Sequence, residues 1–362
     1  MRYNLEIGAL DSMPTAVHVG DGYELQYGFD FLANGKDIYV LDVEKLEDRI
    51  GETENHNPEE MKPLLDAISK RKLVEYIDDN DIDLNSISLR WIDNYYNYKF
   101  EATNIIQSQV HDAFGRPYIP GSSIKGAIRT AIVATMARDV ANKNKYNLKD
   151  VEQNLCGRIN SDFFRFIRVG DAVFDKGCEI VSSLSRLTQI CKHDIKQYIE
   201  AIGLGEDEFA PFVVDIDAEK YEKVKQSGLF SKMVNMPKDV QDISSLLKLI
   251  NDHTIKLVKD EINEWKKYNN NNWAMDYVET MSALLEECNK VDNGKECVLR
   301  IGMGSGKRFV TGAWADSVGE FYDEKNKLTC NPIPVTRAFV ESIQSGFVDL
   351  LGFVKLRIKS VK

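Results

Sequence analysis

The sequence contains no long hydrophobic run. Across its 362 residues, no apolar stretch approaches the roughly 18 to 20 residues that are needed to span a bilayer. The first residues alternate between apolar and polar types, without the basic region and apolar stretch of a secretory signal. We therefore expect a cytoplasmic protein with no membrane partner.

Cysteine is scarce, and its positions follow no pattern. The six cysteines are scattered without a CxxC pair, which is the usual distribution of small core residues in a reducing compartment. Cys191 and His193 lie two positions apart, but no second pair at metal-ligand spacing accompanies them, so core packing is favoured over a zinc site. We predict no metal and no cofactor.

The sequence also lacks the positive net charge of a free-standing nucleic-acid-binding protein. It carries 57 acidic and 46 basic residues, for a formal charge of −11. A nucleic-acid site on such a chain must be a local patch, or must be completed by partner subunits. The 43% apolar and 28% charged residues are typical of a globular protein, and the length accommodates two domains.

Strand-like segments occur near both ends of the chain, with helical patterns between them. Residues 2–9 alternate with the period of a half-buried strand, and further strands are predicted at 38–41, 163–169, 211–216, 298–301 and 353–361. Helical patterns begin at residue 57, after residue 122 and at residue 239. This order predicts an α+β fold whose sheets are assembled from distant segments.

The last predicted strand carries three cations at alternate positions. Lys355, Arg357 and Lys359 lie on one face, opposite apolar residues on the other. A basic sheet face suits a nucleic-acid backbone, but any edge strand also presents polar residues outward. The pattern alone therefore favours neither interpretation.

The segment 116–129, RPYIPGSSIKGAIR, combines a turn with the start of a helix. Pro120-Gly121 favours the turn, and Ser122 or Ser123 is a good N-cap. Apolar residues follow at helical spacing, so one face of the helix is expected to lie on a core. The free backbone N–H groups and the positive dipole end of such a helix attract anions.

Cations surround this helix start. Lys125 and Arg129 lie four residues apart beside the apolar face, and Arg116 precedes the turn. Gly126 lacks a side chain between them, which permits close approach of another backbone. These residues predict a phosphate site, and the alternative is a capped surface helix with solvated cations.

A second candidate segment, RIGMGSGKR at 300–308, contains three glycines that allow positive φ and close contact with a ligand. A Walker A loop would need glycine at position 301 and serine or threonine at position 308, but isoleucine and arginine stand there. The GxGxG spacing also misses the dinucleotide fingerprint. The sharper hypothesis is a basic loop that binds RNA, and the alternative is a flexible hairpin. The predicted RNA-binding residues of this loop are Gly302, Gly304, Gly306, Lys307 and Arg308.

His18, in the segment AVHVGDG at 16–22, is the candidate for acid–base chemistry. It could serve as the general acid or base of a metal-independent endoribonuclease, or stack on a base, or cap a turn. The sequence ties no second catalytic side chain to it. We therefore expect an RNA contact in a protein that is not an enzyme, with the nuclease as the alternative.

In this order, the segments 16–22, 117–129 and 302–306 resemble the opening motif, the turn into the first helix and the glycine loop of the RAMP superfamily (repeat-associated mysterious proteins) of CRISPR effector subunits. The length, the helical insertions and FFRFIRVGDA at 163–172 resemble one member, the terminal backbone subunit of the type III-A (Csm) effector complex.

The resemblance implies ferredoxin-like modules, expected to be two. The first would span 1–216, with a helical insertion at about 44–98, and the second would lie within 217–362 behind a helical tract and carry the glycine loop. The implied partners are the 3′ end of the CRISPR guide RNA, target RNA, the repeated backbone subunit and host nucleases. The implied role is non-catalytic support of guide maturation and target capture in antiviral defence. The alternative is an endoribonuclease that processes CRISPR RNA with His18.

Overall fold

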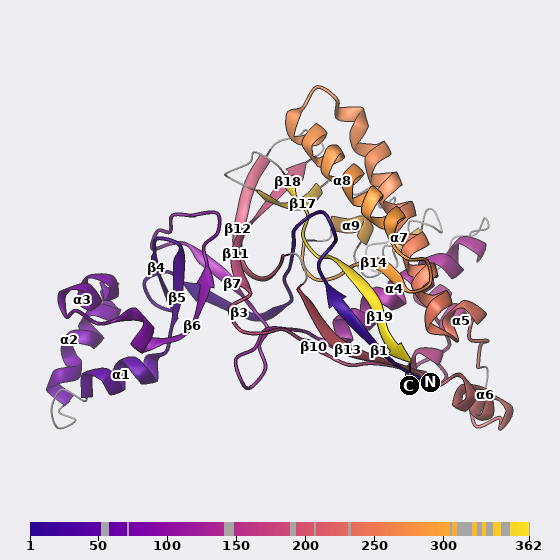
Figure 1. Ribbon diagram of the computed structural model, residues 1–362, viewed down its shortest axis with the longest axis horizontal. Helices are drawn as coiled ribbons and strands as arrows, with labels where there is room; N and C mark the ends of the chain where they lie inside the picture. The colour runs from indigo at the N-terminus through magenta and orange to yellow at the C-terminus, as the bar shows by residue number, and fades with distance from the viewer. Residues whose placement is uncertain are drawn as a thin grey trace.

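The computed structural model (Figure 1) contains two main sheets flanked by helices. Within the described residues, no helix is long and apolar enough to cross a membrane. The structure describes residues 1–51, 58–70, 72–140, 148–188, 193–205, 208–230, 233–304, 306–309, 321–323, 328–330, 336–341 and 348–361.

The first sheet has five strands in the order β14 (Glu296–Arg300), β19 (Phe353–Val361), β1 (Arg2–Gly8), β13 (Phe209–Ile216) and β9 (Ile167–Val169). All neighbours are antiparallel. Helix α4 (Gly121–Val140) connects β1 to β9 in chain order, and α7 (Ile243–Trp265) connects β13 to β14. The chain order is therefore β1-α4-β9-β13-α7, followed by the antiparallel pair β14–β19 with β19 next to β1. This arrangement is ferredoxin-like with one added edge strand, and it confirms the predicted α+β class.

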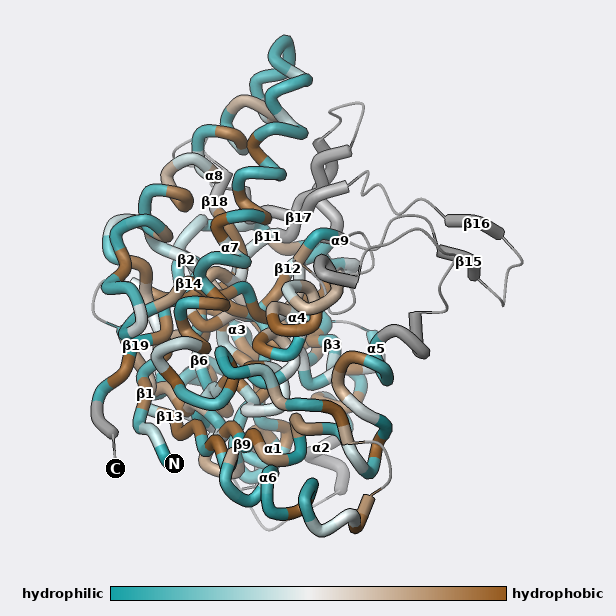
Figure 2. The backbone as a smooth tube through the Cα atoms, turned by 90° about the vertical axis from the view of Figure 1, so that its right-hand side faces the viewer, coloured by the Kyte–Doolittle hydropathy of each residue, from teal (hydrophilic) through white to brown (hydrophobic). Residues whose placement is uncertain are grey.

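Helix α4 packs on this sheet through the apolar face that the sequence predicts. Ile124, Ile128 and Ile132 are buried in one core with Leu5 and Ile7 of β1. Helices α7 and α8 (Asn272–Lys290) form an antiparallel pair whose far end is hydrophilic (Figure 2). Two shorter helices are α5 (Leu148–Cys156) and α6 (Ala218–Gln226).

The second sheet is larger and mixed. Its strands run in the order β3 (Gly20–Gln26), β7 (Ile105–Gln109), β12 (His193–Leu204), β11 (Glu179–Thr188), β6 (Ser88–Asp93), β5 (Asp37–Leu41) and β4 (Phe31–Asn34). Strand β2 (Thr15–Val17) pairs with β12, and β17 (Thr336–Glu341) pairs with β11 and with β18 (Val348–Asp349). Short elements complete the described chain: β8 (Tyr118–Ile119), β10 (Ala172–Val173), β15 (Phe321–Asp323), β16 (Leu328–Cys330) and α9 (Gly306–Phe309).

The predicted helical insertion at about 44–98 is helical in its first two thirds. Helices α1 (Val43–Gly51), α2 (Pro58–Ser69) and α3 (Leu73–Asp79) cover the end of the second sheet that is farthest from the chain termini (Figure 1). Strand β6 then returns the chain to the sheet. Helix α2 begins at Pro58, as the proline after a favourable cap residue predicts.

The two halves of the chain share one sheet. Strands β14 and β19 follow residue 216, the expected boundary between two modules, yet they extend the sheet that holds β1, β9 and β13. Strand β17 likewise joins the second sheet. The ferredoxin-like unit that the structure describes therefore draws on both sides of that boundary.

The strand predicted at 163–169 forms only in its second half. Residues Phe163–Phe166 make a 3₁₀ turn, and the Asp162 carboxylate caps this turn by accepting a hydrogen bond of 2.8 Å from the Phe164 N–H. Phe163 and Phe164 are both buried, with ring centroids 4.6 Å apart. A strand would send these neighbouring rings to opposite faces, so burying both on one core requires the turn.

The cations of β19 have protein partners. Lys355 pairs with Asp11, while the Glu6 carboxylate accepts hydrogen bonds from Arg357 at 2.8 Å and Lys359 at 2.6 Å. The predicted alternation is confirmed, since Val354 and Leu356 on the other face are buried. These three cations therefore neutralise carboxylates of this same chain.

We expect the Glu6→Gln variant to lose stability at neutral pH but not in acid. The hydrogen bond from Lys359, together with Arg357, holds the pKa of Glu6 below its ordinary value of 4.5. A lowered carboxyl pKa stabilises the folded state above that ordinary value, and this gain disappears as pH falls through the folded-state pKa. Because both cations are solvent-exposed, the loss should stay below about 1 kcal/mol. Urea unfolding at pH 7 and pH 3 measures it.

The matched control is Glu47→Gln on the exposed surface of α1. Its unfolding free energy should equal that of the wild type at both pH values. A Glu6→Gln deficit of equal size at pH 3 and pH 7 would show that the carboxylate charge does not stabilise the β1–β19 pair.

Candidate nucleic-acid interface

Helix α4 starts at least two residues earlier than predicted, and its cap is different. The helix begins at Gly121, whose N–H donates to the Asp171 carboxylate at 2.7 Å, while the Ser123 N–H donates to the Pro120 carbonyl at 2.8 Å. The prediction of a cap at Ser122 or Ser123 is therefore wrong. A carboxylate from the loop after β9 serves the first amide, so the predicted anion site begins with one N–H already satisfied.

The two predicted cations of this helix bind the 3₁₀ turn beside it. Lys125 Nζ donates to the Phe164 carbonyl at 2.7 Å, and burial lowers the pKa of Lys125. The Arg129 guanidinium donates to Glu152 at 3.0 Å and to Asp162 at 2.8 Å, and it lies 4.4 Å from the centre of the Phe164 ring. The interpretation of both as freely solvated cations is wrong. A phosphate that contacts Lys125 or Arg129 must therefore bind a cation that already has these protein partners.

Gly126 leaves open space beside the helix. A Cβ atom added there would meet no other heavy atom within 4 Å. The side of α4 between its two cations is therefore accessible to another backbone, as the sequence predicts.

The glycine loop packs directly on the segment that contains His18. Gly302 and Gly304 have φ of +82° and +76°. A Cβ at Gly302 would lie 2.3 Å from the His18 carbonyl oxygen, and the Met303 N–H donates to that oxygen at 2.9 Å. Glycine at position 302 is therefore required both by its positive φ and by the close approach of a second backbone.

A buried arginine holds the same loop from behind. The Arg300 guanidinium donates to the carbonyls of residues 301, 302 and 303 at 2.9, 3.0 and 2.8 Å, and its burial lowers the pKa of Arg300 to about 9. This role of Arg300 was not predicted from the sequence. The available signal was an arginine at an inward position of a strand that leads into a glycine loop.

The other predicted residues of this loop are placed differently. Arg308 donates to the fully buried Glu261 of α7 at 2.7 Å, so its charge is neutralised within the protein. The surroundings of Gly306 and the side chain of Lys307 are outside what the structure describes, and the predicted contact of these two residues with RNA stays a prediction.

His18 is fully buried. Its Nδ1 lies 2.6 Å from the Glu200 carbonyl oxygen, Nε2 has no hydrogen-bond partner among the described residues, and burial lowers the pKa of the imidazole. An imidazole without exposed surface neither stacks on a base nor exchanges a proton with RNA. In this conformation, His18 supports the glycine loop through its backbone carbonyl.

The glycine loop and the turn before α4 converge on this segment. Val19, next to His18, donates its N–H to the Gln109 side chain at 2.9 Å, and its carbonyl accepts from the Val110 N–H at 2.9 Å. Gln109 and Val110 in turn hydrogen-bond Tyr118, three residues before the first residue of α4. Two segments about 180 residues apart in sequence are thus joined through residues 18–19.

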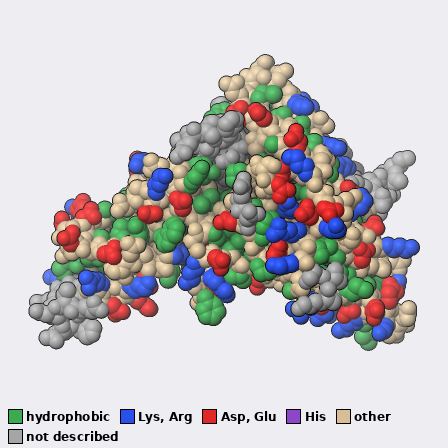
Figure 3. Space-filling model, viewed as in Figure 1, with side chains coloured by type: hydrophobic (Ala, Val, Ile, Leu, Met, Phe, Trp, Pro, Cys, Tyr) green, Lys and Arg blue, Asp and Glu red, His purple; other side chains and the backbone are tan. Residues whose placement is uncertain are grey.

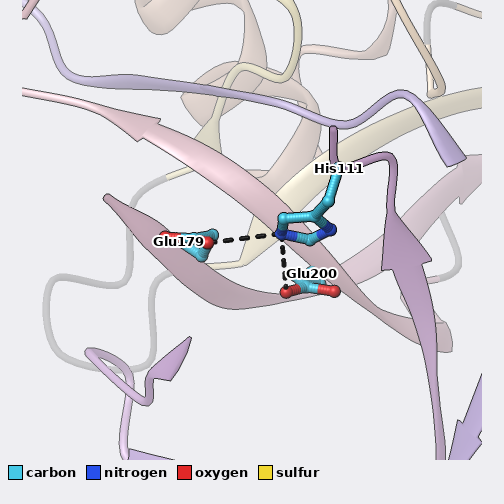
Figure 4. A group of neighbouring side chains, drawn as sticks. All are labelled: His111, Glu179 and Glu200. Atoms are coloured by element: carbon cyan, nitrogen blue, oxygen red, sulfur yellow. Dashed lines mark hydrogen bonds and ion pairs between the residues drawn. The ribbon is translucent and has the colours of Figure 1, made fainter. Parts of the chain in front are cut away.

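A buried ion-pair network lies next to this junction (Figure 4). Arg90 of β6 donates to both carboxylate oxygens of Glu200 of β12, at 2.8 and 2.7 Å. His111 Nε2 lies 3.2 Å from the carboxylate of Glu179 of β11 and 3.7 Å from that of Glu200. Because the Arg90 guanidinium already neutralises Glu200, this trio of potential metal ligands is better suited to joining strands than to holding a cation.

The remaining predicted cation, Arg116, lies on the loop that follows His111. Its guanidinium pairs with Asp112 at 2.7 Å and lies 5.4 Å from the centre of the Phe114 ring. Charges of both signs are interspersed over the face of the molecule seen in Figure 3. On that face the positive side chains do not form one continuous stripe.

Comparisons with known proteins agree with this geometry. The Streptococcus thermophilus protein "CRISPR system Cms protein Csm5" is 30% identical to the chain over 176 residues, which are 43% of this chain and 48% of that protein. The chain thus spans about half the length of this curated relative in the match.

Two solved structures share the fold over nearly the whole chain. One belongs to a cryo-EM structure of a Csm–crRNA–target RNA ternary complex of a type III-A CRISPR-Cas system, with a TM-score of 0.62 at 19% identity and coverage of 99% of this chain and 100% of that chain. The crystal structure of T. onnurineus Csm5 gives a TM-score of 0.62 at 18% identity and covers 96% and 99%.

The family model described as the RAMP superfamily matches residues 14–309. This range contains the His18 segment, the start of α4 and the glycine loop, which are the three motifs that converge in the structure. The chain belongs to the RAMP superfamily.

Proposed function

We propose that this protein is a non-catalytic CRISPR RNA-binding subunit that caps the 3′ end of the guide in a type III-A effector ribonucleoprotein. The convergence of the glycine loop and the start of α4 on residues 18–19 is the observation that carries the proposal. Membership of the RAMP superfamily and likeness to Csm5 proteins support it.

Recognition in this proposal is of RNA backbone and shape, because each guide differs in sequence. The formal charge is −11, and Arg129 and Arg308 of the candidate site, like Arg357, pair with carboxylates of this chain. The groove is therefore completed by the repeated backbone subunit, with several subunits sharing the positive potential. Guide affinity should fall steeply with salt for the assembled complex and less steeply for this subunit alone.

The partners that we propose for the protein are the guide RNA, target RNA, the repeated backbone subunit and host nucleases. We expect it to meet them in the cytoplasm. The role is support of guide maturation and of target capture. Catalysis by His18 is disfavoured because the imidazole is buried. Incubation of the protein with repeat RNA in EDTA tests this, and cleavage that disappears in a His18→Ala variant would favour the nuclease instead.

We expect the Gly126→Ala variant to fold at least as well as the wild type and to bind guide RNA about tenfold more weakly, or about 1.4 kcal/mol. The added methyl group enters open space, and alanine is the better helix former by about 0.5 to 1 kcal/mol. The same methyl group would occupy the place where an RNA backbone approaches α4. Fluorescence anisotropy with labelled guide RNA measures the affinity, and thermal unfolding measures the stability.

Thr135→Ala, further along α4, is the matched control. It raises helix propensity without adding atoms, so it should leave the guide affinity unchanged. Equal guide affinity of Gly126→Ala and the wild type would show that RNA does not approach this side of the helix.

A further inference from the structure

A pocket of about 480 Å³ opens beside the buried ion-pair network. Three segments form it: residues 89–91 of β6, the loop 111–115 before β8, and residues 176–179 at the start of β11. Its volume lies within the range of about 300 to 1,000 Å³ that is typical of small-molecule pockets. None of the motifs that the sequence analysis singled out lies in it.

The walls of the pocket are apolar and unusually exposed. Leu89, Trp91 and Phe114 expose 59%, 47% and 73% of their surface. The Trp91 ring rests on Gly177, where an added Cβ would lie 3.3 Å from the ring and where φ is +88°. The indole is therefore held in place although almost half of it is free to contact a ligand.

The floor of the pocket is polar and buried. The Glu179 carboxylate accepts a hydrogen bond from the Gly177 N–H at 2.8 Å and lies 3.2 Å from His111 Nε2, and Arg90 also lines the pocket. Its partners hold the carboxylate still, so it presents a fixed acceptor edge to a ligand that enters between the rings. A floor of this kind suits a flat ring with N–H groups on its edge better than an aliphatic side chain.

The rim supplies an available cation. Lys176 is exposed, its Nζ lies 3.6 Å from where a Cβ on Gly115 would stand, and no ion-pair partner for it occurs within the described residues. This contrasts with Arg116, which directly follows Gly115 and pairs with Asp112. An exposed aromatic pair, a buried acceptor and a free cation at the rim match the parts of a nucleotide: base face, base edge and phosphate.

We propose that this pocket holds one unpaired nucleobase of the bound RNA, stacked on Trp91 and Phe114, with Lys176 at the adjacent phosphate. The inference rests on the proposed function, because the base belongs to the RNA that this subunit binds. The Arg116–Ile119 segment connects the pocket loop to the start of α4, so one RNA strand can reach both places. Stacking also gives an acidic protein a source of affinity that salt does not screen.

The test compares Trp91→Ala, Phe114→Ala and the double variant with Tyr95→Ala, a matched control because Tyr95 is an exposed aromatic that does not line the pocket. Anisotropy with a labelled single-stranded guide should show about tenfold weaker binding for each single pocket variant and a larger loss for the double variant. The control should bind as the wild type does. Lys176→Ala should lower the slope of log K against log salt by about one.

Site-directed crosslinking identifies the base. Guides that carry 4-thiouridine at single positions should crosslink to Trp91 or Phe114 from one position, and adenosine monophosphate at millimolar concentration should not compete. Competition by the mononucleotide would mean that free nucleotides are the ligand and would overturn the proposal. Pocket variants that bind guide RNA with normal affinity would also overturn the proposal. If such variants failed to assemble with the other subunits, the pocket would be a protein contact instead.

The two proposals fail differently. A wild-type protein that binds no guide, alone or in the assembled complex, contradicts the proposed function. A wild type that binds guide, with pocket variants of equal affinity and no crosslink at Trp91 or Phe114, contradicts the pocket alone. Thermal unfolding of each variant shows whether the fold is intact, and Lys176→Ala, which removes an exposed side chain, provides a readout that does not depend on the rings.

Discussion

The Gly302→Ala variant is expected to unfold with a free energy about 3 kcal/mol lower than that of the wild type. Positive φ costs an alanine about 1 to 2 kcal/mol, and Gly302 has φ of +82°. The new methyl group would also lie 2.3 Å from the His18 carbonyl oxygen. Relief of that clash displaces the loop and breaks the Met303–His18 hydrogen bond, which contributes about 1 kcal/mol.

Guide affinity should fall together with stability in this variant, by more than tenfold, because the displaced loop no longer meets residues 18–19. Urea unfolding and anisotropy on one preparation measure both quantities. Gly28→Ala separates the two causes, since Gly28 has φ of +76° but an added Cβ there meets nothing within 4 Å. If both variants lost the same unfolding free energy, the positive φ alone would explain the loss, and the close approach to His18 would not contribute to it.

The Arg90→Ala variant is expected to lose about 3 to 5 kcal/mol of folding free energy, the usual cost of leaving one member of a buried ion pair alone. Glu200 is fully buried and accepts two hydrogen bonds from Arg90. Its backbone carbonyl also contacts His18, so the loss should extend to the junction of the glycine loop with the segment before α4. Urea unfolding, with guide binding as a second measurement, tests this.

Arg116→Ala is the matched control, because Arg116 forms an exposed pair with Asp112, and such pairs contribute little to the free energy of unfolding. Adding Glu200→Gln to Arg90→Ala should restore part of the stability, since it removes the isolated charge. A double variant that is less stable than Arg90→Ala would mean that the Glu200 carboxylate is stabilised by groups other than Arg90.

The elements that sequence could predict are those with a local, periodic cause. The strand at 353–361 alternates and was found with those bounds, and the apolar face of α4 packs as its spacing indicates. The 3₁₀ turn at Phe163–Phe166 was not predicted, because two adjacent aromatic residues are typical of a strand. Its cap by Asp162 is local, and an aspartate before a paired aromatic was the available signal.

The partners of the candidate site were beyond the reach of local patterns. Lys125 and Arg129 are predicted from the sequence to bind a phosphate, with solvated surface cations as the alternative, but Phe164 and Asp162 bind them from more than 30 residues away. Asp171 takes the first amide of α4 from 50 residues away. Polar contacts of this kind leave no periodic trace, since they are set by how distant elements pack.

The pairing of β1 with β19 has a consequence for synthesis of the protein. Strand β1 is synthesised well before one of its two neighbours in the sheet, because residues 353–361 follow it some 345 residues later in the sequence. Until then β1 has one open edge, and β14, whose neighbour among the described strands of this sheet is β19, cannot join. The ferredoxin-like sheet is therefore completed only after residues 353–361 are made, and a product that stops before residue 353 would expose an edge prone to aggregation.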